Sequence, residues 1–141
     1  DDTDLKRYLA TARTIALVGA SPKPHRDSHH VMRYLQAQDY NVRPINPAAA
    51  GTTILGEMVL GSLADLAEPV EIVDIFRRSD AVGPVVDAVT AALPTLGRPL
   101  IWMQLGVDNA QAAARAREAG LEVVANRCIK IDHARLLGSN S

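Results

Sequence analysis

The residues with the clearest chemical potential follow the first apolar run of the chain, Thr14 to Val18. Gly19 ends this run, and a helix-like pattern begins near Ser28 after a short polar loop. Glycine allows a tight turn and close backbone approach, while a helix start offers free N–H groups and a partial positive charge. The loop therefore favours phosphate binding; the alternative is a solvent-exposed turn, and Ser28 is predicted to cap the helix in either case. The candidate contacts are Gly19, Ala20, Ser21, His25, Arg26 and Ser28.

The usual dinucleotide fingerprint is missing from this region. It needs three spaced glycines and an acidic residue about 20 positions further on, which holds the ribose hydroxyls. Glycine is absent between Ala20 and Pro24. The second apolar run ends in Ile45, Asn46 and Pro47, none of which carries a carboxylate. The pattern disfavours a nicotinamide dinucleotide and favours a nucleotide whose adenosine is held in another way.

Polar residues also follow the later apolar runs. Arg77 and Arg78 come after Phe76, and guanidinium groups suit bidentate phosphate contacts. Since adjacent residues of an extended segment face opposite ways, the alternative for at least one of the pair is a solvated side chain. Further candidates at the ends of the last two runs are Gln104, Asn126 and Arg127.

For two other residues, in or just after these runs, a structural role is favoured. Trp102 lies within an apolar run and is predicted to pack in the core. Cys128 is interpreted as a small buried hydrophobe, because a reactive thiolate needs a partner that the sequence does not place.

Catalytic signatures are scarce. The sequence has no HExxH motif, no GxSxG elbow and no Walker loop. His29 and His30 are interpreted as neighbours at a helix start rather than as metal ligands. The acidic residues Asp65, Asp74 and Asp87 are too scattered to suggest an acid/base pair. We therefore expect a protein without metal and without catalytic activity of its own.

The elements that must position these residues alternate along the chain. Five near-continuous apolar runs rich in β-branched residues predict strands covered on both faces, as in a parallel sheet. They are Thr14–Val18, Asn41–Ile45, Glu71–Phe76, Leu100–Met103 and Leu121–Ala125. The alternation predicts an α/β doubly wound sheet of five parallel strands in the order 3-2-1-4-5, with ligands outside the carboxyl ends of the strands.

Helical spacing fills the segments between the strands, so each crossover is predicted to be a helix. The clearest helices carry Val31, Met32 and Leu35, then the valines from Val82 to Val89, then an alanine-rich segment that ends at Gly120. Asp2 or Thr3 is expected to cap a leading helix through Ala12, and Cys128 to Leu137 to form a closing one. Gly138 to Ser141 is interpreted as a frayed tail.

Length and composition set the class of protein. The 141 residues fit a single domain, with a core from about residue 14 to residue 137, and a net charge of −1 gives no general attraction to nucleic acid. A single cysteine argues for a reducing compartment, so the cytoplasm is expected. The first residues are acidic and polar, and no run approaches the roughly 18 apolar residues of a membrane helix.

Several sequence blocks together resemble the stand-alone coenzyme A-binding proteins, relatives of the nucleotide-binding domain of the succinyl-CoA synthetase α subunit. The blocks are IALVGASPKPHRDSHHVMRYL, VRPINP, ILGEMVLGSLADL, EIVDIFRRSDAV, LIWMQLGV and AREAGLEVVANRC. They occur in the right order over about residues 14 to 137. The resemblance implies a Rossmann-like domain that holds coenzyme A.

The resemblance also implies a role for each loop. Pyrophosphate would lie on the first loop, adenosine near Asn46 and Phe76, and the pantetheine arm towards Gln104 and Asn126. The implied binding residues are Gly19, Ala20, Ser21, Arg26, Ser28, Asn46, Pro47, Phe76, Arg77, Arg78, Gln104, Asn126 and Arg127.

The sequence departs from the family at two points. Relatives often carry a basic residue after the proline of the second loop, whereas Ala48 follows Pro47 here, which removes one expected contact to the 3′-phosphate. The phosphohistidine domain of the synthetases has no counterpart. The leading hypothesis is a binding protein for coenzyme A or acyl-CoA. The alternatives are an NAD(P)-binding redox protein and a coenzyme A-binding subunit of a ligase or transferase complex with an unknown protein partner.

Overall fold

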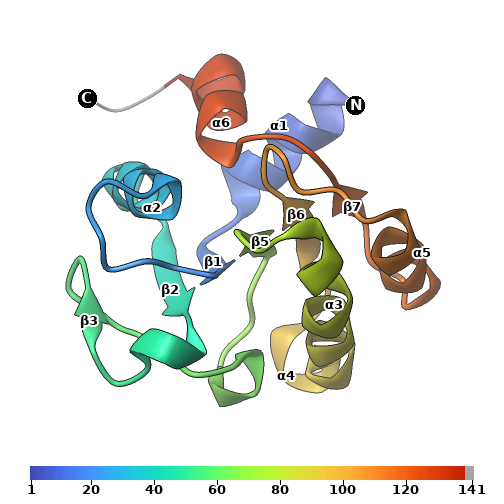
Figure 1. Ribbon diagram of the computed structural model, residues 1–141. Helices are drawn as coiled ribbons and strands as arrows, with labels where there is room; N and C mark the ends of the chain where they lie inside the picture. Colours follow the sequence, from blue (N-terminus) through green and yellow to red (C-terminus); the bar gives the residue numbers. More distant parts are fainter. Residues whose placement is uncertain (139–141) are drawn as a thin grey trace.

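Five parallel strands form the central sheet of the computed structural model, which describes residues 1–138 (Figure 1). The strands are β1 (Thr14–Val18), β2 (Asn41–Ile45), β5 (Ile72–Ile75), β6 (Leu100–Met103) and β7 (Val123–Val124). They confirm the predicted five-stranded parallel sheet, although β5 and β7 are shorter than predicted.

The strand order differs from the predicted one. The observed order is β2-β1-β5-β6-β7, so the third predicted strand lies beside β1 and not outside β2. The outer edge of β2 is taken by the backbone of Leu60, which donates to Pro44 O at 3.0 Å and accepts from Asn46 N at 2.9 Å. Pro44 itself has no N–H, and proline within a sheet is confined to edge strands and similar positions. The third strand therefore pairs on the free side of β1.

The connection from β2 to β5 contains no α-helix, so the prediction of a helical crossover is wrong there. Two short 3₁₀ turns, η1 (Pro47–Ala49) and η2 (Leu63–Asp65), flank a hairpin of β3 (Thr53–Ile54) and β4 (Glu57–Met58). The segment follows the edge of β2 and then crosses towards the centre of the sheet. It brings η1 next to the carboxyl end of β1.

Helices cover both faces of the sheet (Figure 1). They are α1 (Asp2–Thr11), α2 (Asp27–Ala37), α3 (Val82–Ala91), α4 (Leu93–Leu96), α5 (Ala110–Glu118) and α6 (Ile129–Leu137), with the turn η3 (Ser79–Ala81) before α3. Alternate residues of β1 point to opposite faces of the sheet. Ala16 belongs to the core cluster with α3 and α5, whereas Leu17 belongs to the cluster with α1, α2 and α6. This two-sided burial explains the near-continuous apolar runs.

The helix ends correct two predicted caps. Asp1, rather than Asp2 or Thr3, caps α1 through a bond from Asp4 N at 2.9 Å. Arg26 occupies the N-cap of α2 without a side-chain bond, so Ser28 lies inside the helix and is not its cap. Gly120 adopts the predicted left-handed conformation, with φ 88°. Of the predicted tail, residues 139–141 lie outside the described residues.

Candidate functional site

Two hollows lie along the carboxyl ends of the strands. The first hollow, of about 480 Å³, is bounded by the loop after β1, the η1 turn and Phe76 after β5. The second hollow, of about 710 Å³, is bounded by α2, the loops after β5 and β6, and the start of α6. In the corrected strand order the topological switch point lies between β1 and β5, where ligands bind in such sheets. The first hollow lies at this switch point.

Gly19 is required by its geometry at the first hollow. Its φ is 87°, and a Cβ atom there would lie 2.2 Å from the carbonyl oxygen of Phe76. Its N–H donates to Ile45 O at 2.8 Å, which ties the end of β1 to the end of β2. The absence of a side chain lets the three loops meet closely enough for backbone groups to face one ligand.

The loop after Gly19 is braced from within. Ser28 Oγ accepts a bond from Ser21 N at 3.1 Å, and Ser21 Oγ accepts from Lys23 N at 3.1 Å. Arg26 N donates to Lys23 O at 3.1 Å. Ser21 and Ser28, predicted as direct contacts, therefore line the first hollow while also fixing the shape of the loop.

The start of α2 offers donors to the first hollow. Among the described residues no group accepts a hydrogen bond from the backbone N–H of Asp27 or of Ser28. The exposed side chains of Lys23 and Arg26 line the same hollow, and both are cationic. The carboxylate of Asp27 opposes them. Free N–H groups, a helix dipole and two cations together suit an anionic group of a ligand.

Asn46 holds the second loop in place. Its Nδ2 donates to Ala20 O at 2.8 Å, and its Oδ1 accepts from Ala48 N at 3.0 Å. Asn46 and Ala48 line the first hollow, whereas the predicted contacts Ala20 and Pro47 do not. Ala20 is buried and takes part through its backbone carbonyl.

The second hollow joins polar and apolar walls. It is lined by four predicted residues, Phe76, Arg77, Arg78 and Gln104. Arg78 forms an exposed ion pair with Asp80 at 3.2 Å, which matches the solvated alternative for one of the two arginines. Asp27 and Phe76 line both hollows, so the two adjoin each other.

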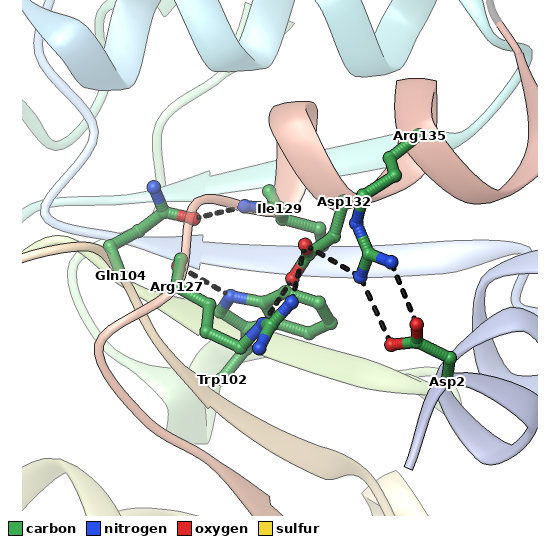
Figure 2. A network of polar contacts seen from close by, with 7 residues as sticks. All are labelled: Asp2, Trp102, Gln104, Arg127, Ile129, Asp132 and Arg135. Carbon is green, nitrogen blue, oxygen red and sulfur yellow. Dashed lines mark hydrogen bonds and ion pairs between the residues drawn. The ribbon is translucent and has the colours of Figure 1, made fainter.

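Gln104 is the most deeply buried polar residue of the second hollow, with 4% of its surface exposed. Its Oε1 accepts a bond from Ile129 N at 3.0 Å and so orients the start of α6. Figure 2 shows the Nε2 of the same amide pointing away from Ile129. Within residues 1–138 this nitrogen has no protein partner, and it is not sealed inside the core. This N–H group is therefore available to donate a hydrogen bond to a bound molecule.

Asn126 and Arg127, like Ala20 and Pro47, line neither hollow. Arg127 forms a bidentate pair with Asp132 at 2.6 and 2.8 Å, and Asp132 also accepts from Arg135, which pairs with Asp2 on α1 (Figure 2). These bonds raise the pKa of Arg127 and lower the pKa of Asp132 below its usual range. Asn126, at φ 60°, accepts from Gly106 N at 2.7 Å. In the structure, both side chains brace the loop before α6.

The structure clarifies the roles of three further residues. Trp102 is fully buried as predicted, and its Nε1 donates to Arg127 O at 2.8 Å. Cys128 is half-buried and lines the second hollow, so it is less enclosed than predicted. Asp74 is fully buried on β5 without a hydrogen-bond partner, and burial raises the pKa of its carboxyl well above the usual value. We therefore interpret Asp74 as a neutral acid in the core.

Sequence reasoning missed one wall of the site. Asp27, His30 and Val31 of α2 line the second hollow, and their i, i+3, i+4 spacing places them on one helix face. This spacing in the sequence could have indicated that the three residues form one wall of the site. Across the described chain no cluster of three or more His, Cys, Asp or Glu is placed to hold a metal. None of the described helices has the length and apolarity needed to span a membrane.

Comparisons with known proteins identify one family for this chain and solved proteins that share its fold. The profile of the family described as "CoA binding domain" matches residues 13–134. The chain is 33% identical over 131 residues to the uncharacterized protein YneT of Bacillus subtilis strain 168, covering 93% of each chain. A solved protein of Thermus thermophilus is 40% identical with a TM-score of 0.91, covering 97% of this chain and 99% of that one. A hypothetical protein of Pyrococcus horikoshii OT3 is 38% identical with a TM-score of 0.89, covering 98% and 93%.

Proposed function

Because the chain belongs to the CoA binding domain family, we propose that it binds coenzyme A across the first and second hollows. The observation that carries the proposal is the continuity of the two hollows, which share Asp27 and Phe76. One hollow has an anion-binding character and the other has larger apolar walls. Coenzyme A has the same two parts, a charged nucleotide and a long neutral arm.

The phosphates fit the first hollow. The free N–H groups of Asp27 and Ser28 and the side chain of Arg26 would bind the pyrophosphate, which needs the close backbone approach that Gly19 permits. The adenosine would lie near Asn46 and Phe76. Ala48 stands where relatives often carry a basic residue, so the 3′-phosphate would have fewer partners on the η1 side.

The pantetheine arm fits the second hollow. From Phe76 it would run past Arg77 towards Gln104, whose free Nε2 can donate to an amide carbonyl. The side chains of Asn126 and Arg127 are committed to Gly106 and Asp132. We therefore assign them the support of the α6 loop in place of direct contact with the arm.

We further propose that the protein carries coenzyme A or its thioesters without transforming them. Neither hollow contains a nucleophile hydrogen-bonded to a base among the described residues. The single cysteine supports a place in the cytoplasm. A partner chain that supplies chemistry would make the protein a subunit of a ligase or transferase complex, and co-purification would reveal such a partner.

Mass spectrometry of small molecules released from the purified protein tests the proposed ligand. We expect coenzyme A or acyl-CoA at a substantial fraction of one per chain from wild type, and much less from Arg26→Ala. Recovery of a nicotinamide dinucleotide in their place would refute the proposal.

A further inference from the structure

Two large apolar side chains lie exposed at the mouth of the second hollow. Leu105 after β6 is 64% exposed and Ile131 on α6 is 58% exposed, and both line the hollow. Val31 and Val107 extend the apolar wall inward. Exposed side chains of this size gathered on one concavity are typical of a binding surface. This apolar end has no counterpart in the charged part of coenzyme A.

Gln104 marks how far along the hollow the pantetheine arm reaches. Gly19 ends β1 and Gln104 follows β6, which lies two strands away across β5. Strands lie about 4.8 Å apart, so these two points are separated by roughly 10 Å. An extended covalent chain advances about 3.5 Å for every three bonds. The carbonyl carbon of the amide nearest the sulfur of coenzyme A is eight bonds from the phosphate ester oxygen, or roughly 9 Å, which is close to the separation of roughly 10 Å expected between Gly19 and Gln104.

The sulfur and any acyl group must then lie beyond Gln104. Four further bonds carry the chain roughly 5 Å on, the width of one more strand, towards β7 and the start of α6. Leu105 follows Gln104 directly after β6, Ile131 lies in the first turn of α6, and both line the hollow.

We propose that the second hollow seats the apolar acyl group of a coenzyme A thioester against Leu105 and Ile131, with Gln104 Nε2 binding the last amide of the arm. This proposal rests on the proposed function and narrows its ligand from coenzyme A to acyl-CoA with a hydrocarbon acyl chain. We call the surface of Leu105 and Ile131 the acyl seat.

The cations around the second hollow disfavour an acyl group that ends in a carboxylate. Arg78 is paired with Asp80, and Lys130 Nζ lies 5.6 Å from the ring centroid of Tyr34. The side chain of Arg77 runs beside Gly19, where its Cδ would contact a Cβ at 3.2 Å. All three cations line the second hollow and each has a contact apart from Leu105 and Ile131, and these two apolar side chains offer a carboxylate no charged or polar partner.

Calorimetric titration with coenzyme A and with its acetyl, butyryl, hexanoyl and succinyl thioesters tests the proposal. A fully buried methylene is worth about fourfold in affinity, and about half of that free energy is expected on a seat open to solvent on one side. Hexanoyl-CoA has four more methylenes than acetyl-CoA. We therefore expect it to bind roughly 15-fold more tightly, and succinyl-CoA to bind more weakly than butyryl-CoA.

Substitutions at the acyl seat provide the second arm of the test. Leu105→Asn and Ile131→Gln should each reduce the ratio of hexanoyl-CoA to acetyl-CoA affinity by about threefold or more. Met58→Asn is the matched control, because Met58 is also 60% exposed but lies on β4, outside both hollows. It should leave the ratio unchanged. Because Leu105 and Ile131 are exposed, melting temperatures should confirm that these variants fold.

The outcomes separate this proposal from the proposed function. Equal affinity for acetyl-CoA and hexanoyl-CoA, with coenzyme A itself bound, would overturn the acyl seat and leave the proposed function standing. Tighter binding of succinyl-CoA than butyryl-CoA would also overturn it. So would a change of oligomeric state in Leu105→Asn without a change in acyl preference, because the patch would then bind a second copy. No binding of any of these ligands would refute the proposed function and the seat together.

Discussion

Replacing Gly19 with alanine should damage both stability and binding, and the structure supplies a matched control. Gly19 and Gly56 have nearly equal φ angles of 87° and 85°. A Cβ at Gly56 would meet no atom within 4 Å, whereas one at Gly19 would lie 2.2 Å from the Phe76 oxygen. The two substitutions therefore share the backbone strain and differ in the clash.

The expected magnitudes follow from these two contributions. Left-handed backbone costs a residue with a Cβ about 1–2 kcal/mol, so Gly56→Ala should lose about that much stability. Forcing an extra carbon into a packed site costs about a further 1–3 kcal/mol, and the group that must move at Gly19 is backbone. Gly19→Ala should therefore lose about 2–5 kcal/mol. At about 4 °C per kcal/mol, the melting temperature should fall by about 4–8 °C for Gly56→Ala and about 8–20 °C for Gly19→Ala.

Thermal unfolding and coenzyme A titration of both variants provide the assay. Since Gly19 lines the first hollow and Gly56 lies on the β3–β4 hairpin, we expect a loss of affinity of about tenfold or more only for Gly19→Ala. Equal falls in melting temperature would show that the clash with Phe76 does not exist. A destabilised Gly19→Ala with unchanged affinity would refute the role of this close approach in binding.

Three further substitutions test other parts of the site and the fold. Arg26→Ala should lower the affinity for coenzyme A about 10- to 150-fold in calorimetry, because the proposal places this side chain on the phosphates. The ligand-free melting temperature should move by no more than about 2 °C, because the exposed side chain does not pack in the core. Asp27→Asn should raise the affinity for coenzyme A about two- to fivefold in the same assay, because it removes a carboxylate that lines the proposed phosphate site. It should lower the free energy of unfolding by about 0.3–1 kcal/mol in denaturant titrations, because an acidic side chain stabilises the start of α2. The lowered pKa of Asp132 stabilises the fold above the unfolded value near 4, and this contribution is lost as pH falls through the folded pKa. Asp132→Asn should thus be less stable than wild type at pH 7 by about 1–2 kcal/mol, and unfolding curves from pH 7 to pH 2 should show the difference shrinking below pH 4.

The sequence predicted the layers of the fold well because burial on two faces leaves a direct mark on composition. The run Ile15–Val18 is apolar at every position, and Ile72–Ile75 is apolar except for Asp74; such near-continuous runs are typical of buried strands or fully buried helices. The order of the strands depends on which strands lie at the edges of the sheet, and only one residue of the sequence, Pro44, indicates this. Pro44 marks β2 as an edge strand, which is incompatible with the predicted order.

The site was predicted as a set of loops more reliably than as a set of side chains. Gly19, Arg26, Asn46 and Phe76 lie together at the first hollow, because the carboxyl ends of parallel strands meet at one edge of the sheet. Arg127 follows β7 at that edge, yet its guanidinium turns to Asp132 on α6. Asp132 is only five residues further along the chain, but the direction of the Arg127 side chain depends on how the loop and α6 pack, which the local sequence does not specify.

Isothermal titration of the purified protein with coenzyme A and, separately, with NAD tests the central claim most directly. The free N–H groups at the start of α2 and the absence of a carboxylate at the end of β2 predict saturable binding of coenzyme A at one per chain and no measurable binding of NAD. Saturable binding of NAD with no heat from coenzyme A would contradict the assignment of both hollows.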